Sequence, residues 1–136
     1  MVAGGCFCGN VRYEAGGESE ASILCHCYDC RKISGSTYSS NSVFSEDQFK
    51  ITKGTPKKHT VKADGGNEIT SMFCGDCGST MWREGATFAG KRIVKAGTLD
   101  DHAFLDNYKV NAELFAKNRP QWVGAQEGAA QKDGMS

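Results

Sequence analysis

The 136-residue sequence lacks several features that mark large classes of protein. No apolar run approaches the roughly 20 residues that a helix needs to span a bilayer. The first ten residues, MVAGGCFCGN, lack the basic and then apolar pattern of a secretory signal. We therefore expect a soluble, cytoplasmic protein. Sixteen basic residues offset 16 acidic ones, and this balance argues against broad electrostatic binding to nucleic acid or to a membrane surface.

Helical patterns are also scarce, whereas short β-type segments are common. Only YDCRKIS (28–34) and LDDHAFLDN (99–107) favour a turn or two of helix. Segments rich in Val, Ile, Thr, Tyr and Phe, bounded by turn residues, predict strands at 11–15, 36–44, 49–54, 58–63, 67–73, 79–84 and 91–97. ADGGNE (63–68) predicts a hairpin turn, because Gly65 and Gly66 can adopt positive φ. The sequence thus predicts a mainly β fold of short strands with little helix.

One domain is expected to span residues 1–123. A chain of this length suits a single domain with a modest core, and no change of composition marks a boundary inside it. The following segment, GAQEGAAQKDGMS (124–136), lacks apolar anchors, so it is predicted to be a flexible tail. The sequence leaves the oligomeric state open.

Seven cysteines carry most of the functional information. An odd number leaves at least one thiol outside any disulfide framework. Pairs such as Cys6 and Cys8, or Cys25 and Cys27, are too close in sequence to reach disulfide geometry without strain. A reducing cytosol would also keep the thiols free. Metal ligation is the interpretation that remains.

The cysteines divide into a group of four and a group of three. FCGDCG (73–78) matches a zinc knuckle, in which glycines let the backbone turn around Cys74 and Cys77. The pair in GCFCG (5–9), Cys6 and Cys8, would complete the four thiolates of a structural zinc. Three cysteines then remain: Cys25, Cys27 and Cys30. Three thiolates leave one position of a zinc ion open, as catalytic zinc requires, although spacing alone leaves other partitions open.

Residues beside the three-cysteine group are candidates for further roles. His26 could be a fourth ligand, but a residue between two ligands usually points away from the metal, which favours a hydrogen bond to a carbonyl or a place in the pocket wall. Arg31 and Lys32 could offset the negative charge of a thiolate-bound metal. Arg31 is the better candidate for holding an anion through two nitrogens, whereas Lys32 is equally well explained as a solvated cation.

More distant side chains are weaker candidates. Three could transfer protons, although such residues more often cap a turn or face solvent: Asp29, Asp76 and His102. Three aromatic residues could line a pocket, although packing over the zinc or the core is more common: Tyr28, Trp82 and Trp122.

Five motifs, in this order, resemble the glutathione-dependent formaldehyde-activating enzyme family, which also includes centromere protein V. They are GGCFCGNVRYEA (4–15), CHCYDCRKISGS (25–36), FCGDCGSTMW (73–82), AGTLDD (96–101) and ELFAKNRPQW (113–122). The resemblance implies a single-domain β-tent of short antiparallel strands around two zinc ions per chain. It implies a structural zinc on Cys6, Cys8, Cys74 and Cys77. It implies an open zinc site on Cys25, Cys27 and Cys30.

The resemblance also implies an activity. The family condenses formaldehyde with glutathione to S-(hydroxymethyl)glutathione, so we expect a zinc-dependent carbon–sulfur lyase whose partners are a small thiol and a small aldehyde. The candidate substrate-binding residues are Arg31, His26 and Trp82. Two alternatives stay open: a noncatalytic zinc module that presents a β surface to a partner, and a thiol-responsive sensor that loses its second zinc. The zinc content before and after a thiol titration would separate them in part.

Overall fold

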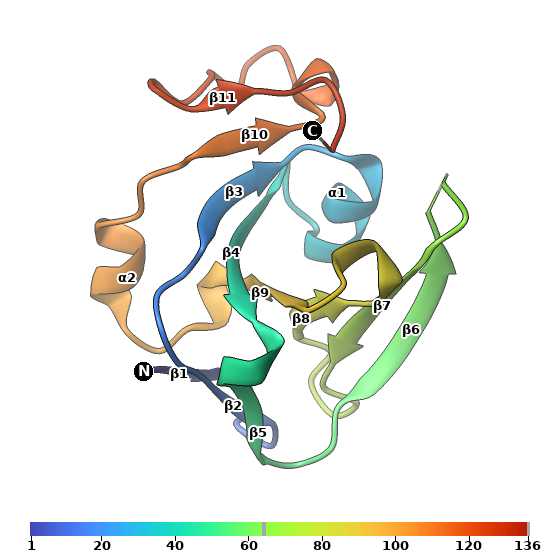
Figure 1. Cartoon of the computed structure of the whole chain (residues 1–136), viewed down its shortest axis with the longest axis vertical. Coiled ribbons are helices and arrows are strands. Elements are labelled where there is room, and N and C mark those ends of the chain that lie inside the picture. Colours follow the sequence, from blue (N-terminus) through green and yellow to red (C-terminus); the bar gives the residue numbers. More distant parts are fainter. Residues whose placement is uncertain (64, 136) are drawn as a thin grey trace.

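A computed structural model describes residues 1–63 and 65–135 as two β-sheets with little helix (Figure 1). The smaller sheet contains β1 (Val2–Gly5), β2 (Arg12–Ala15) and β5 (Phe49–Lys53). The larger sheet contains β3 (Ala21–Cys25), β4 (Ser39–Ser45), β6 (Lys57–Lys62), β7 (Glu68–Phe73), β8 (Thr80–Glu84), β9 (Lys91–Lys95), β10 (Ala112–Leu114) and β11 (Ala130–Gln131). Its strand order is β11–β10–β3–β4–β9–β8–β7–β6, and that of the smaller sheet is β1–β2–β5.

The mainly β fold expected from the sequence is confirmed. Each of the seven predicted strand segments overlaps one observed strand, and both predicted helices form, as α1 (Tyr28–Ser34) and α2 (His102–Asp106). Short 3-10 turns occur at Glu46–Gln48, Ala86–Phe88, Ala96–Thr98 and Ala116–Asn118. The predicted hairpin joins β6 to β7, and Gly66 has φ 89° there. Asp64, in the same predicted turn, lies outside the described residues.

One edge of the large sheet departs from the antiparallel arrangement expected throughout. Strand β10 runs parallel to β3, and β11 runs parallel to β10. After β9 the chain passes through α2, which lies at the end of the sheet where β3 begins (Figure 1). The next strand therefore enters from that end and runs in the same direction as β3. The sequence pattern alone did not predict β1, β3, β10 or β11.

Part of the segment after Val123, including β11, lies along this parallel edge. The N–H of Ala130 donates to the carbonyl of Asn111 at 2.9 Å, and the N–H of Lys132 donates to the carbonyl of Glu113 at 2.9 Å. These bonds hold the final segment to β10. The flexibility predicted for residues 124–136, and the domain boundary before them, stay predictions.

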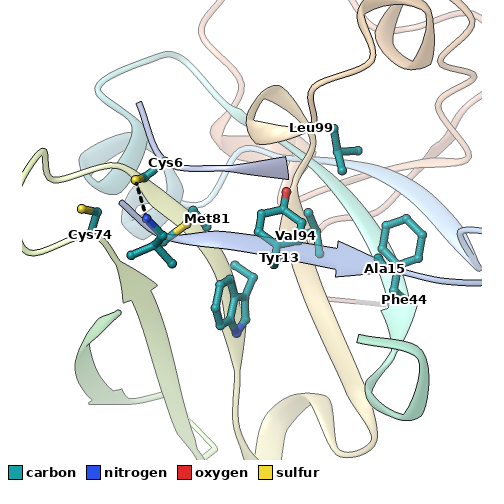
Figure 2. Packing of buried hydrophobic residues seen from close by; sticks show 10 residues of the cluster. Cys6, Tyr13, Ala15, Phe44, Cys74, Met81, Val94 and Leu99 are labelled. Atoms are coloured by element: carbon teal, nitrogen blue, oxygen red, sulfur yellow. Dashed lines mark hydrogen bonds between the residues drawn. The ribbon is translucent and has the colours of Figure 1, made fainter. Parts of the chain in front are cut away.

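The hydrophobic core lies between the small sheet and one face of the large sheet. Figure 2 shows Tyr13 from β2 among side chains of the large sheet that include Phe44 and Val94. The Tyr13 ring stacks on Phe49 at 5.2 Å between centroids and meets the edge of Trp82 at 5.8 Å. Successive side chains of a strand alternate between the two faces of a sheet, so the opposite face of β4, β9, β8 and β7 is available for a site. We call this second surface the cleft face.

Among the described residues, the helices are too short and too polar to cross a membrane.

Candidate metal centres and the adjoining cleft

The four cysteines expected to form a structural site come together where the two sheets meet. They are Cys6, Cys8, Cys74 and Cys77, and their Sγ atoms all lie within 4.8 Å of one another. Two come from the loop between β1 and β2, and two from the loop between β7 and β8. The cluster therefore connects the small sheet to the large sheet.

Each loop curls so that backbone N–H groups face sulfur. The N–H of Val11 donates to Cys6 Sγ at 3.2 Å, the dashed contact beside Cys6 in Figure 2. The N–H of Asp76 donates to Cys74 Sγ at 3.4 Å. Gly78 has φ 79°, a left-handed value that favours glycine, and this lets its N–H bond the carbonyl of Cys74 at 2.8 Å. Such donors stabilise thiolates rather than thiols.

Polar contacts also join the two loops directly. The Asn10 side chain donates to Asp76 Oδ2 at 2.9 Å, and the N–H of Phe7 donates to Ser79 Oγ at 3.0 Å. Asp76, which the sequence suggested as a proton-transfer residue, thus lies beside this cluster, where its hydrogen bond to Asn10 connects the two loops.

The donor set and spacing of the four-cysteine cluster fit a tetrahedral metal. Zinc–sulfur bonds of about 2.3 Å in a tetrahedron separate the sulfurs by about 3.8 Å. The Sγ of Cys8 lies 3.7 Å from that of Cys6 and 3.7 Å from that of Cys74. The Ser79 hydroxyl and N–H lower the pKa of Cys77 to about 5. The group could therefore hold a metal ion of this kind.

The remaining three cysteines form a second group on one strand and one helix. Cys25 ends β3, Cys27 caps the N-terminus of α1, and Cys30 lies in the first turn of that helix. Their Sγ atoms lie within 4.8 Å of one another. Cys27 Sγ accepts from the N–H of Cys30 at 3.2 Å, and it is the only one of the three that is not buried. The partition into four and three, which the sequence left open, matches this grouping.

Thiols packed this closely compete for negative charge. Contacts with Cys27 and Cys30 raise the pKa of Cys25. Contacts with Cys25 and Cys27, together with a smaller effect of the nearby Lys95 ammonium, lower the pKa of Cys30 to about 2. The arrangement therefore favours one thiolate and disfavours three. A bound divalent cation reverses this preference, because it deprotonates coordinating thiols outright.

His26 is fully buried but is not part of the three-cysteine group. Its Nε2 donates to Glu113 Oε1 at 2.7 Å. The other carboxylate oxygen of Glu113 accepts from the N–H of Gln126 at 2.8 Å and from Gln131 Nε2 at 2.7 Å. The side chain thus connects the cysteine segment to β10 and to the final residues of the chain.

A cleft of about 1310 Å³ adjoins the three-cysteine group. Its walls are α1, the cleft face and the β6–β7 hairpin. Five Lys and Arg side chains line it: Lys32, Lys62, Arg83, Lys95 and Lys117. Among the described lining residues, the one acidic side chain is Asp29. Positive charge is concentrated in the cleft although the whole chain has a formal net charge of zero.

The other predicted site residues are distributed unevenly around this cleft. Tyr28 and Asp29 line it. Arg31 is exposed, and its guanidinium lies 5.5 Å from the centroid of the Tyr28 ring. Trp82 is buried in the core, where its Nε1 donates to Glu84 at 2.8 Å, and this position does not favour contact with a substrate. Two further candidates are not among the described lining residues of the cleft: His102 and Trp122.

Sequence reasoning missed Arg83 and Lys95, which line the cleft. Each follows a buried residue of a predicted strand, in STMWRE and KRIVKAG. In a strand with one buried face, a charged residue at such a position ordinarily faces water. The alternation therefore places both side chains on the face away from the core. Nothing local indicates that α1 and a hairpin enclose that face.

Comparisons with known proteins agree with this architecture. The family model described as glutathione-dependent formaldehyde-activating enzyme matches residues 1–118, which include all seven cysteines. The crystal structure of a Rhodobacter sphaeroides protein is similar with a TM-score of 0.62 and 17% identity, over 79% of this chain and 96% of that chain. At this identity the likeness concerns the fold alone. A search of curated proteins gives no match.

Proposed function

The chain belongs to the glutathione-dependent formaldehyde-activating enzyme family, and on this premise we propose that it is a zinc-dependent carbon–sulfur lyase. Its substrates in this proposal are a small thiol, such as glutathione, and a small aldehyde, such as formaldehyde. The observation that carries the proposal is the position of Cys25, Cys27 and Cys30, which form a three-thiol group in the wall of a large cleft.

We assign one zinc ion to each cysteine cluster. Cys6, Cys8, Cys74 and Cys77 would hold a structural ion with all four ligands from the chain. The second ion would have three ligands from the chain: Cys25, Cys27 and Cys30. When bound, it supplies an open position at which a thiol is taken up as its thiolate. In this proposal the open position would face the cleft, and the incomplete burial of Cys27, which lines the cleft, supports this.

The reaction joins the sulfur of the thiol to the carbonyl carbon of the aldehyde. One carbon–sulfur bond forms and the carbonyl π bond breaks, while the proton lost by the thiol ends on the aldehyde oxygen. The reverse reaction breaks the carbon–sulfur bond and returns both reactants. Asp29 lies in the cleft wall, in the first turn of α1, and is the chain's candidate for carrying this proton.

The experiment that tests the proposal follows exchange between formaldehyde and glutathione by NMR. The wild-type protein should accelerate exchange above the uncatalysed rate. Cys27→Ser should lower that acceleration by more than about 100-fold, since even changes outside the ligand shell cost about 10–100-fold. Serine keeps an acceptor at the N-cap of α1, so the helix should remain. Ser36→Ala, at an exposed position after the helix, is the matched control.

The same samples discriminate among the three interpretations of the sequence. No acceleration by the wild type, with two zinc ions that resist glutathione, would favour a noncatalytic zinc module. No acceleration, with one zinc lost on adding glutathione, would favour a thiol-responsive sensor. Either result contradicts the lyase assignment and leaves the family membership unaffected.

A further inference from the structure

Two basic side chains are buried on the cleft face without an acidic partner. Arg83 is 5% exposed and Lys95 is 9% exposed, and both line the cleft. The ion pairs between described residues include neither of them. A buried charge is costly unless an opposite charge or a ligand compensates it. These two positions therefore call for an anion.

The strand register places the two cations on the same face. Arg83 of β8 pairs with Ile93 of β9, and Lys95 lies two residues after Ile93. Side chains two residues apart on a strand point the same way. The residues that directly precede them, Trp82 and Val94, are paired with each other and point into the core. Arg83 and Lys95 therefore project together into the cleft and leave room for a ligand between the sheet and α1.

Neutral acceptors hold both cations in place. The Nε of Arg83 donates to Ser71 Oγ at 3.1 Å, and the Nζ of Lys95 donates to Asn41 Oδ1 at 2.7 Å. Such bonds orient a cation and leave its charge uncompensated. For the described residues, the Nε contact is the one hydrogen bond from the Arg83 guanidinium, so its two terminal nitrogens remain as donors. A guanidinium in this state suits a carboxylate, which can accept from two nitrogens at once.

The thiolate cluster accounts for only part of the positive charge. Lys95 lies near Cys30, so the Lys95 ammonium and the Cys30 thiolate stabilise each other's charged form. A divalent ion with three thiolates carries a net charge of −1. A substrate thiol that binds as its thiolate would bring this charge to −2, which Arg83 and Lys95 balance. The other basic side chains of the cleft, Lys32, Lys62 and Lys117, would then offset the charge of a carboxylate on the same substrate.

We propose that Arg83 and Lys95 bind the carboxylate of a thiol substrate whose sulfur lies at Cys25, Cys27 and Cys30, an inference that rests on the proposed function. The lysines at the cleft surface, Lys32, Lys62 and Lys117, attract such an anion toward the site. The substrate class is therefore a thiol that also carries a carboxylate. Neutral thiols of the same size bind more weakly.

The test compares two thiols of similar size, 3-mercaptopropionate and 3-mercapto-1-propanol, by calorimetry with the zinc-loaded protein. The carboxylate-bearing thiol should bind about 10-fold or more tightly, the range expected for charge-assisted hydrogen bonds. Arg83→Gln and Lys95→Gln should each reduce this preference. Lys53→Gln, at an exposed position on β5 outside the cleft lining, should retain it.

A measurement on the wild type keeps the test independent of how the variants fold. Propionate, which has no sulfur, should shift the NMR signal of the Arg83 Nε–H, and 1-propanol should not. Equal affinities for the two thiols, or an Arg83 signal that propionate leaves unchanged, would overturn this inference alone. If neither thiol binds while propionate still shifts Arg83, the proposed function fails together with the thiol part of the inference, and an anion site without a thiol site remains.

Discussion

The four-cysteine and three-cysteine clusters use the same side chain in two different settings. The four-cysteine cluster draws its ligands from two loops on different sheets, with donors from Val11 and Asp76 aimed at its sulfurs. The three-cysteine cluster takes its ligands from the end of one strand and the first turn of one helix, beside a cleft. The first joins parts of the chain that are distant in sequence. The second adjoins the cleft, so in the proposed function the first cluster holds the fold and the second holds a ligand.

The strongest way to break this comparison is to remove one ligand from each cluster. Cys74 is buried and belongs to the hydrophobic core cluster, so Cys74→Ser should unfold the protein. Loss of a structural zinc removes about 10 kcal/mol or more in small domains. Cys27→Ser should instead remain folded and retain one zinc per chain. Circular dichroism and zinc content of the two purified variants measure the contrast, and identical behaviour would contradict the division into two kinds of site.

A smaller effect is expected when the metal is removed from the intact protein. Titration with glutathione or a mild chelator should release one zinc per chain first, because a competing thiol can approach an ion with an open side. NMR signals of α1 should change, while those of Gly9 and Gly78, in the four-cysteine loops, should stay. Cys27→Ser, already without the second ion, should release no zinc under the same conditions. Simultaneous loss of both ions would show that the clusters are not separable.

The smallest effect concerns the support of the three-cysteine segment by β10. Burial alone would raise the pKa of Glu113, but hydrogen bonds from Gln131, His26 and Gln126 lower it. A carboxylate whose pKa is lowered by folding stabilises the fold above its unfolded pKa, near 4.5, and loses this effect as the pH falls through the folded value. Glu113→Gln should therefore cost about 2 kcal/mol near neutral pH.

The difference in unfolding free energy between wild type and Glu113→Gln should shrink at pH 4 and below. Urea denaturation at pH 7 and pH 4 measures it, with Glu127→Gln as the control at an exposed position in the same segment. A cost that does not change with pH would mean that the charge of Glu113 contributes nothing. The four-cysteine cluster should retain its zinc in both variants at pH 7, because Glu113 does not contact it.

The parts of the fold that the sequence predicts are those with local signals. Strands with β-branched and aromatic residues between turn residues, such as β7 and β9, stand out, and so does the short helix after Cys27. Strand β1 has the sequence VAGG and β10 has AEL, which carry little strand preference of their own. Strand β10 forms because β3 offers a free edge to it, and that edge depends on the tertiary fold.

In the candidate site, too, the residues with local sequence signals could be predicted, and those that depend on the tertiary fold could not. Cysteine motifs are local, so the sequence identifies both groups. The cations of the cleft depend on what covers their strands, since Arg83 and Lys95 are ordinary outward-facing charges until α1 and the β6–β7 hairpin enclose them. His26 is a further example: the sequence favoured a hydrogen bond to a carbonyl or a place in the pocket wall, but a carboxylate 87 positions away in the chain accepts from its Nε2. Two residues as far apart in the sequence as His26 and Glu113 form no short motif, so the sequence does not show that they are in contact.

The sulfur of Cys27, besides belonging to the three-cysteine cluster, caps the N-terminus of α1 by accepting a hydrogen bond from the N–H of Cys30. That bond needs no ion, so the first helical turn keeps its shape whether the cluster is loaded or empty. A metal ion that binds here would therefore find the first turn of α1 already formed, and its release would leave that turn folded. In the proposed function, a metal ion at this cluster would therefore bind and leave without unfolding and refolding of the helix.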